Sequence, residues 1–327
     1  MFFYFSRFLI QLALPIFLKA LRVFGKQNLN SKTPYIIASN HSGSFFDALV
    51  IGSVVKKQIN TLARGDVFKK PAVAFWLRQI KLIPVFRGTE GRQYVKNHGE
   101  TTKEAYDALK SGGNVVVFSE GICKNEWNLR PLGKGTARMA YETWYGPNPI
   151  HEMRVLPTGV NYEHFRGPGK RVVLNFGNEI KQTDIQTDPE EYEKWLREFT
   201  ELLAVRMSAE ILSVNSDLPA NVQQQEVKAY FDQKAPVSPH SNPVLGVLGA
   251  LGRFIHKPIY HFFERKAAKL TARTVFYDSV LFGLLIYLYP IIVLLISQII
   301  GFVFGYQAAI ICFVTLPLLI RIGANQS

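Results

Sequence analysis

Short apolar runs alternate with longer amphipathic stretches between residue 34 and about residue 180, and one further amphipathic stretch follows. Short apolar runs bounded by turn residues are typical of buried strands, and apolar residues three or four positions apart are typical of helices. The predicted strands are Tyr35–Ala38, Ile59–Ala63, Leu82–Phe86, Val115–Phe118, Val155–Val160 and Val172–Phe176. The predicted helices are Ala48–Lys56, Ala72–Ile80, Val95–Lys110, Thr136–Trp144 and Pro189–Val214. This alternation predicts an α/β domain over residues 29–214, with a mixed, mostly parallel sheet flanked by helices.

Residues 1–28 are apolar, but polar side chains recur at steps of three or four across a break at Pro15. These polar residues are Arg7, Gln11, Lys19, Arg22 and Lys26. The pattern predicts amphipathic helices that lie in a membrane interface, and the alternative is an amphipathic helix packed on a soluble core. A secretory signal is disfavoured because the basic residues are scattered through the segment.

The longest apolar stretch, Ser279–Ile320, carries no charged side chain. A membrane-spanning helix needs roughly 20 apolar residues, so two such helices fit here with a tight turn near Gln298–Gly301. We predict a transmembrane hairpin and a short tail over residues 274–327, since Pro290 and Pro317 are tolerated in membrane helices. The alternative is a pair of helices buried in a soluble core.

Two segments join the predicted domain to this hairpin. Residues 215–243 are polar and contain scattered prolines, which predicts a linker with one short helix. Residues 244–273 are apolar but dotted with basic side chains, as in a helical segment that lies against anionic headgroups beside a membrane span. Basic residues flank the hairpin on both sides: Lys257, Arg265, Lys266, Lys269, Arg273 and Arg321. The positive-inside rule therefore predicts that the α/β domain lies on the cytoplasmic face, at the inner membrane if the protein is bacterial.

The composition narrows the possible partners of the chain. A formal net charge of +13 and a pI near 9.6 indicate anionic partners. Because the basic residues gather near the predicted membrane segments and form no recognition motif, we expect a lipid bilayer and no nucleic acid. Cys123 and Cys312 give no disulfide framework, and the seven histidines show no metal-ligand spacing. We therefore predict no metal site.

The candidate chemistry begins directly after the first predicted strand of the α/β domain, where α/β proteins place their ligands. Asn40 and His41 follow that strand, and Asp47 comes after five further residues. An imidazole accepts protons near neutral pH, and a carboxylate can fix its tautomer, so the pair suits general-base catalysis. Five intervening residues do not bring the two side chains together on a continuous helix, but Gly43 allows the backbone to depart from helical geometry.

A structural role for the same acid is equally open. Ser44 followed by Asp47 resembles a capping box at the start of a helix. In that interpretation Asp47 caps backbone donors and His41 is a polar loop residue, although the two roles of Asp47 are compatible.

Further polar residues lie near the ends of other predicted strands. Arg87 follows one strand in a turn, where a guanidinium suits a phosphate group. Ser119, Glu120 and Gly121 follow another, and Arg130 and Lys134 lie among glycines further along. These residues complete the predicted substrate-binding set, to which Asn40 also belongs.

Four blocks in this order resemble the glycerolipid acyltransferases, the family of lysophosphatidic acid and glycerol-3-phosphate acyltransferases. The blocks are Asn40 to Asp47, Ile83 to Arg87, Phe118 to Gly121 and Val155 to Val160, within a resemblance that covers about residues 30–205. Two departures are evident. The family usually has four residues between His and Asp, and its third block normally continues with an arginine where Ile122 stands here. Arg130 or Lys134 is expected to supply that charge.

The resemblance implies that His41 deprotonates an acceptor hydroxyl for attack on an acyl thioester while Asp47 orients the imidazole. It also implies that Arg87 holds the acceptor phosphate, and that Glu120 and Gly121 shape the acceptor site. The expected protein is a membrane-bound O-acyltransferase without a bound cofactor, which uses acyl-CoA or acyl carrier protein to convert 1-acyl-sn-glycerol-3-phosphate to phosphatidic acid. Two alternatives remain open: acylation of glycerol-3-phosphate or another lysolipid, and a non-catalytic membrane-associated lipid-binding protein. A serine hydrolase is disfavoured because Ser42 and Ser44 lack a G-x-S-x-G elbow.

Overall fold

The computed structural model describes residues 2–30, 32–85, 98–237 and 242–325. Within these residues, seven strands form one sheet in the order β1-β7-β6-β2-β5-β3-β4. The strands are β1 Leu18–Phe24, β2 Tyr35–Ser39, β3 Ile59–Arg64, β4 Leu82–Val85, β5 Asn114–Phe118, β6 Arg154–Tyr162 and β7 Lys170–Phe176. The strands from β6 to β4 are parallel to one another, β7 is antiparallel to β6, and β1 is parallel to β7. The predicted mixed, mostly parallel sheet is confirmed.

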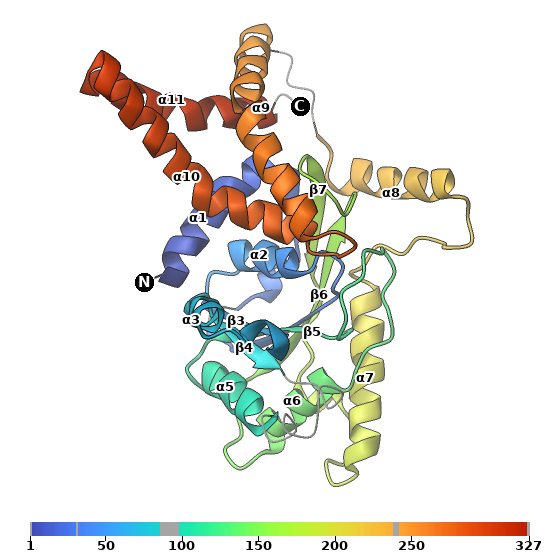
Figure 1. Ribbon diagram of the computed structural model, residues 1–327. Coiled ribbons are helices and arrows are strands. Elements are labelled where there is room, and N and C mark those ends of the chain that lie inside the picture. Colours follow the sequence, from blue (N-terminus) through green and yellow to red (C-terminus); the bar gives the residue numbers. More distant parts are fainter. Residues whose placement is uncertain (1, 31, 86–97, 238–241, 326–327) are drawn as a thin grey trace.

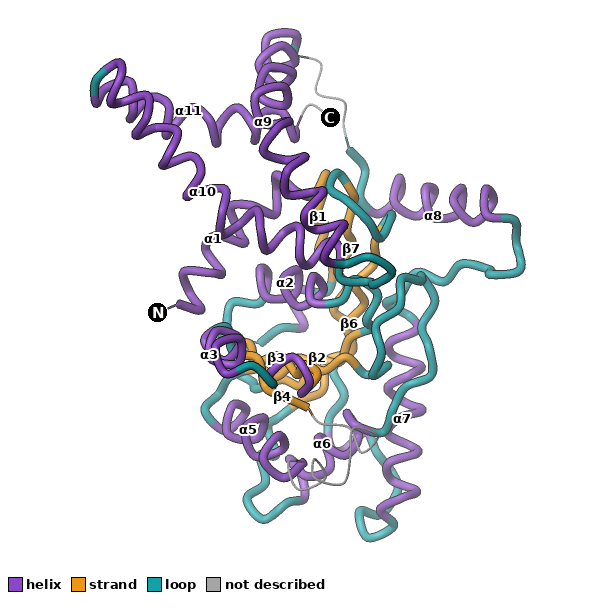
Figure 2. The backbone as a smooth tube through the Cα atoms, in the orientation of Figure 1, coloured by secondary structure: helices purple, strands orange, loops and turns teal. Residues whose placement is uncertain are grey.

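Helices cover both faces of this sheet (Figures 1 and 2). They are α1 Phe2–Phe17, α2 Phe45–Val54, α3 Pro71–Gln79, α5 His98–Lys110, α6 Gly135–Tyr145, α7 Tyr192–Ser208, α8 Ala220–Lys234, α9 Pro243–Leu270, α10 Tyr277–Phe304 and α11 Tyr306–Asn325. Successive side chains along the strands point to opposite faces of the sheet, where they enter two separate cores. One core joins the sheet to α5, α6 and α7, and the other joins it to α1, α2, α9 and α10. The carboxyl ends of the parallel strands therefore lie between two packed layers of helices.

The prediction that residues 1–28 are entirely helical is wrong for residues 18–24, which form strand β1 at the edge of the sheet. In this strand Leu21 and Val23 pack against the core, whereas Lys19 and Arg22 are exposed. Over only seven residues, the spacing of apolar and polar side chains in a strand resembles that in a short amphipathic helix. Pairing with β7 satisfies its backbone and decides between the two structures.

Helix α1 buries Leu14 and Phe17 in the core, and two of its polar side chains bind the end of α2. The Arg7 guanidinium donates to the carbonyl oxygen of Lys56 at 2.7 Å, and the Gln11 amide donates to that of Ser53 at 2.9 Å. These carbonyl groups lie at the carboxyl end of α2. The exposed side of α1 carries Tyr4, Phe5, Phe8 and Leu12. The helix therefore packs on the core through one apolar side and exposes a second one, and its place in a membrane interface stays a prediction.

The C-terminal helices differ from the prediction in two details. Helix α10 ends at Gly305, which has a φ of 89°, and the chain does not turn near Gln298–Gly301. Glycine adopts this backbone conformation without a steric penalty, whereas Gln298 and its neighbours continue the helix.

The polar segment 215–243 contains the fifteen-residue helix α8, whose Val227 and Phe231 pack against Val173. Burial of this apolar stripe stabilises the helix, which explains why it is longer than the short helix predicted for this segment.

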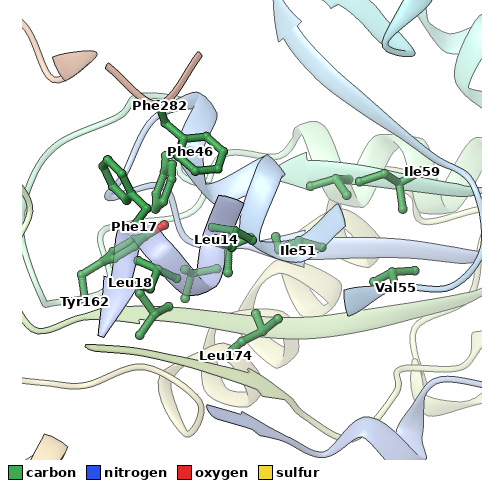
Figure 3. Packing of buried hydrophobic residues seen from close by; sticks show 14 of the residues in the cluster. Leu14, Phe17, Leu18, Phe46, Ile51, Val55, Ile59, Tyr162, Leu174 and Phe282 are labelled. Carbon is green, nitrogen blue, oxygen red and sulfur yellow. The ribbon is translucent and has the colours of Figure 1, made fainter. Parts of the chain in front are cut away.

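Helices α10 and α11 are each long and apolar enough to cross a membrane. Only 22% and 6% of their most apolar windows are buried, so they are not a pair of helices hidden in a soluble core. The first turns of α10 are the exception. There Phe282 packs edge-on against Phe17 and Phe46, with ring centres 5.1 and 5.3 Å away, as Figure 3 shows. The start of an apolar helix therefore completes the core of the α/β domain.

Truncation of Phe282 to alanine is expected to lower the free energy of unfolding by about 3–5 kcal/mol, because the side chain is only 1% exposed and leaves a cavity. Phe302→Ala on the same helix is the matched control, since Phe302 is 94% exposed and its loss leaves no cavity. Denaturant titration in mild detergent compares the two variants. Equal losses in both would contradict the shared core.

Candidate active site

Three neighbouring parallel strands bring the candidate residues to one edge of the sheet. Strand β2 lies between β6 and β5, and Ser39 of β2 is in register with Phe118 of β5 and Thr158 of β6. The residues just beyond β2 and β5, together with the last residue of β6, therefore meet. This arrangement joins His41, Glu120 and Tyr162, which are far apart in the sequence.

His41 and Asp47 form a hydrogen-bonded pair. The imidazole Nδ1 lies 2.9 Å from Asp47 Oδ2, and the Asp47 side chain has no exposed surface, whereas that of His41 is 18% exposed. The carboxylate also accepts the Gly43 N–H, with both oxygens 3.0 Å from the nitrogen, and the Tyr162 hydroxyl, which donates to Oδ1 at 2.7 Å. Three donors suit an ionised, acceptor-only carboxylate. When Nδ1–H donates to Asp47, the lone pair lies on Nε2, the nitrogen that can accept a proton.

The backbone around Gly43 explains how five intervening residues permit this contact. Ser44 has a φ of 60° and a ψ of −140°, and α2 begins directly after it. The strained turn folds Asp47 back toward the loop. A β-carbon at Gly43 would lie 2.6 Å from Asp47 Oδ1 and 2.8 Å from the Tyr162 hydroxyl, so only glycine fits.

The structure also bears on the capping interpretation of Ser44 and Asp47. The Ser44 side chain makes no capping hydrogen bond, so the predicted capping box is wrong. Asp47 nevertheless accepts the backbone N–H of Gly43 while it holds His41. The strained turn therefore places one backbone donor and the imidazole on the same carboxylate.

Aromatic and amide contacts fix the loop that carries His41. The imidazole stacks on the Phe118 ring, with the centres 3.9 Å apart and the planes 12° from parallel. The Asn40 amide donates to the Val160 carbonyl oxygen at 3.0 Å, and the amide oxygen accepts the Val160 N–H at 2.8 Å. Asn40 is 4% exposed, so it fastens the loop to β6. The structure gives Asn40 this structural role, and its contact with substrate stays a prediction.

A second buried carboxylate organises the loop after β5. Glu120 accepts the backbone N–H of His41 at 2.9 Å, the backbone N–H of Arg130 at 3.0 Å and the Arg130 guanidinium at 2.8 Å. Its side chain is 3% exposed. Gly121, with a φ of 71°, makes the turn that follows. The Arg130 guanidinium also pairs with Glu126 at 2.9 Å, so its charge supports the loop.

The other predicted binding residues lie in different surroundings. The Ser119 hydroxyl is buried and lies 2.9 Å from the Thr136 hydroxyl. Lys134 forms a solvent-exposed ion pair with Glu193 of α7 at 2.6 Å. Ser119 thus joins β5 to the start of α6, and Lys134 joins α6 to α7. Arg87 lies outside the residues that the structure describes.

Sequence reasoning missed Tyr162 and the position of Cys123. Tyr162 follows the fourth block by two residues, but its contact with Asp47 depends on the order of the strands. Burial and the neighbouring Asp47 raise the pKa of the Tyr162 hydroxyl well above its usual value, so it remains a donor. Burial, with a smaller effect of Asp47, raises the pKa of the Cys123 thiol to about 12. A neutral thiol is a poor nucleophile, so Cys123 is not a candidate nucleophile here. Among the described residues, no group of three or more His, Cys, Asp or Glu side chains could hold a metal ion.

Comparison with known proteins agrees with the resemblance found in the sequence. Residues 20–160 match the family model described as Acyltransferase. Over 120 residues it is 28% identical to the 1-acyl-sn-glycerol-3-phosphate acyltransferase of Bacillus subtilis (strain 168), covering 36% of this chain. The chain spans about half, 55%, of the length of that relative.

A solved structure is also similar to the chain. It is the 1-acyl-sn-glycerophosphate (LPA) acyltransferase PlsC from Thermotoga maritima, with 20% identity and a TM-score of 0.40. The likeness covers 59% of this chain and 74% of that one.

Replacement of Tyr162 by phenylalanine removes one donor from a fully buried carboxylate and keeps the aromatic packing. We expect turnover to fall about tenfold, because a hydrogen bond to a charged group is worth roughly 1.5–3 kcal/mol and the ring still fills its site. Steady-state kinetics and thermal unfolding measure the two effects separately. Tyr230→Phe, a change in the same residue type on α8, is the control. Unchanged turnover in Tyr162→Phe would refute a role of the hydroxyl.

Native Cys123 is expected to resist alkylation at pH 8. With a pKa of about 12, only about one thiol in ten thousand is ionised at that pH. Mass spectrometry of iodoacetamide-treated Cys312→Ser protein, folded and in denaturant, gives the ratio of the two rates. Rapid modification of the folded protein would contradict the raised pKa.

Proposed function

We propose that this protein transfers an acyl chain from a thioester to the free hydroxyl of 1-acyl-sn-glycerol-3-phosphate, which yields phosphatidic acid. The observation that carries the proposal is the His41–Asp47 pair at the carboxyl end of β2, within the residues that match the acyltransferase family. The name of the similar Bacillus subtilis protein supports this choice of acceptor.

In the proposed reaction, His41 Nε2 takes the proton of the acceptor hydroxyl as its oxygen attacks the thioester carbonyl carbon. The new C–O bond forms, the C–S bond breaks, and the imidazolium returns its proton to the leaving thiolate. The buried Asp47 carboxylate stabilises the transient imidazolium and holds Nε2 toward the acceptor. General-base assistance of this kind contributes about 10²–10⁴-fold to the rate.

The acceptor and donor are both anionic, which suits a chain with a formal net charge of +13. Acyl-CoA and acyl carrier protein are the proposed donors, as substrates, and no bound cofactor takes part. We assign the acceptor phosphate to Arg87 on the basis of its block in the sequence. Glu120 and Gly121 then contribute by holding the backbone of the acceptor site, since Glu120 is bound to His41 and Arg130.

We also propose that the protein is integral to a membrane, with its α/β domain on the cytoplasmic face. Helices α10 and α11 support this membrane assignment. Both are long enough to cross a membrane, their mean hydropathies are 2.6 and 1.9, and little of either helix is buried. The outward apolar side of α1 supports contact with the same bilayer. The basic residues of α9 and Arg321 support the orientation.

The test compares purified wild type, His41→Ala and His151→Ala with a labelled acyl thioester. Lysophosphatidic acid and glycerol-3-phosphate are offered separately. We expect wild type to prefer lysophosphatidic acid, and His41→Ala to lose at least about a hundredfold of the rate. His151 is exposed and bound to Gln182, so its variant is expected to match wild type.

Preference for glycerol-3-phosphate would change the acceptor but keep the chemistry. Transfer to neither acceptor, or full activity in His41→Ala, would refute the proposal. Undiminished lysolipid binding by an inactive wild type would favour a non-catalytic lipid-binding protein.

A further inference from the structure

The first turn of α10 contacts the segment that holds the catalytic pair. The hydroxyl oxygen of Ser279 accepts the backbone N–H of Phe46 at 3.0 Å, across 233 residues of sequence. Phe46 immediately precedes Asp47 and lies in the first turn of α2. Ser279 therefore acts on the backbone that carries the carboxylate.

Helix α2 receives this outside contact at a start that no side chain of its own caps. The Ser44 side chain makes no capping hydrogen bond, and its φ of 60° is unfavourable for a residue with a β-carbon. The first amides of a helix take acceptors from the preceding turn or from elsewhere. The Phe46 N–H has both, the Gly43 carbonyl oxygen at 3.2 Å and the Ser279 hydroxyl at 3.0 Å. A strained turn persists only where its surroundings hold it. Ser279 provides such an acceptor beside Asp47.

A second contact from the same turn reaches the other support of Asp47. The Asp278 carboxylate accepts the Gly167 N–H at 2.7 Å and forms a close ion pair with Lys170. The Lys170 ammonium lies 5.4 Å from the centre of the Tyr162 ring, and the Tyr162 hydroxyl donates to Asp47. Both Asp278 and Lys170 are buried. The pair therefore holds the β6–β7 turn and the underside of the Tyr162 ring in one arrangement.

We propose that Asp278 and Ser279 are positioning residues for the His41–Asp47 pair, so that docking of α10 on the α/β domain sets the geometry of the active site. The inference rests on the proposed function and extends it. In this view the apolar hairpin acts on turnover as well as on attachment to the membrane. The effect persists when substrates are supplied in detergent micelles, where attachment to a bilayer plays no part.

Two serines of α10 provide a matched test. Ser279→Ala removes the acceptor, Ser279→Thr keeps it, and Ser297→Ala removes a buried hydroxyl that has no hydrogen-bond partner in the described part of the chain. We expect Ser279→Ala to lower kcat about fivefold, the size of a typical helix-cap contact, with KM for either substrate unchanged. We expect Ser279→Thr to restore kcat and Ser297→Ala to match wild type. Asp278→Asn, which weakens the Lys170 pair, is expected to lower kcat in the same direction.

A spectroscopic measurement makes the test independent of turnover. The proton on His41 Nδ1, when hydrogen-bonded to Asp47, gives a downfield resonance in ¹H NMR. Faster exchange or an upfield shift of this resonance in Ser279→Ala, with recovery in Ser279→Thr, supports the inference. Thermal unfolding of each variant separates loss of positioning from loss of fold.

Three results would overturn the inference: an unchanged resonance and kcat in Ser279→Ala, failure of threonine to restore them, or an equal effect of Ser297→Ala. An inactive wild type in which the resonance still responds to Ser279→Ala would refute the proposed function and leave the positioning role intact.

Discussion

Burial of the Asp47 carboxylate is the constraint on which the rest of this site depends. A carboxylate without exposed surface is costly unless donors surround it. Its donors come from the turn at Gly43, from His41 and from Tyr162 at the end of β6. Satisfying one charge therefore fixes the exit of β2, the end of β6 and the imidazole together. Glu120 does the same for the loop after β5, and its bond to the His41 backbone links the two loops.

Helix α10 is buried in the core of the α/β domain at its start and exposed further along. Its first turns contribute Leu281, Phe282 and Ile286 to the core that also contains Phe46 of α2 and Leu174 of β7 (Figure 3). Its later turns expose Ile299, Phe302 and Phe304. Helical backbone connects the two parts and continues through Pro290. The α/β domain and the hairpin are therefore packed as one body at the end of the sheet where β6 and β7 meet.

The sequence predicts the layers of this fold and the central pair better than it predicts the surroundings of that pair. Strand periodicity located the strands from β2 to β7, and the chemistry of His41 and Asp47 indicated their contact. The roles of Tyr162 and Asn40 could not be predicted in the same way, because both depend on β6 lying beside β2. Strand β1 was missed because its alternation is too short to distinguish from a helix. The turn at Gly305 was missed because Gln298 and Gly301 carry the same kind of signal as Gly305 and Gln307.

The hydrogen bond between Phe46 and Ser279 has a consequence for the order in which the protein folds during synthesis. Helix α2 is made early, but the residues that cover its apolar side and accept its amide are separated from it by most of the chain. Contacts of such long sequence separation form late. The side of Phe46 that faces Phe282, and its hydrogen bond to Ser279, therefore wait until the start of α10 has left the ribosome. Insertion of the hairpin and completion of the active site become the last steps of one process.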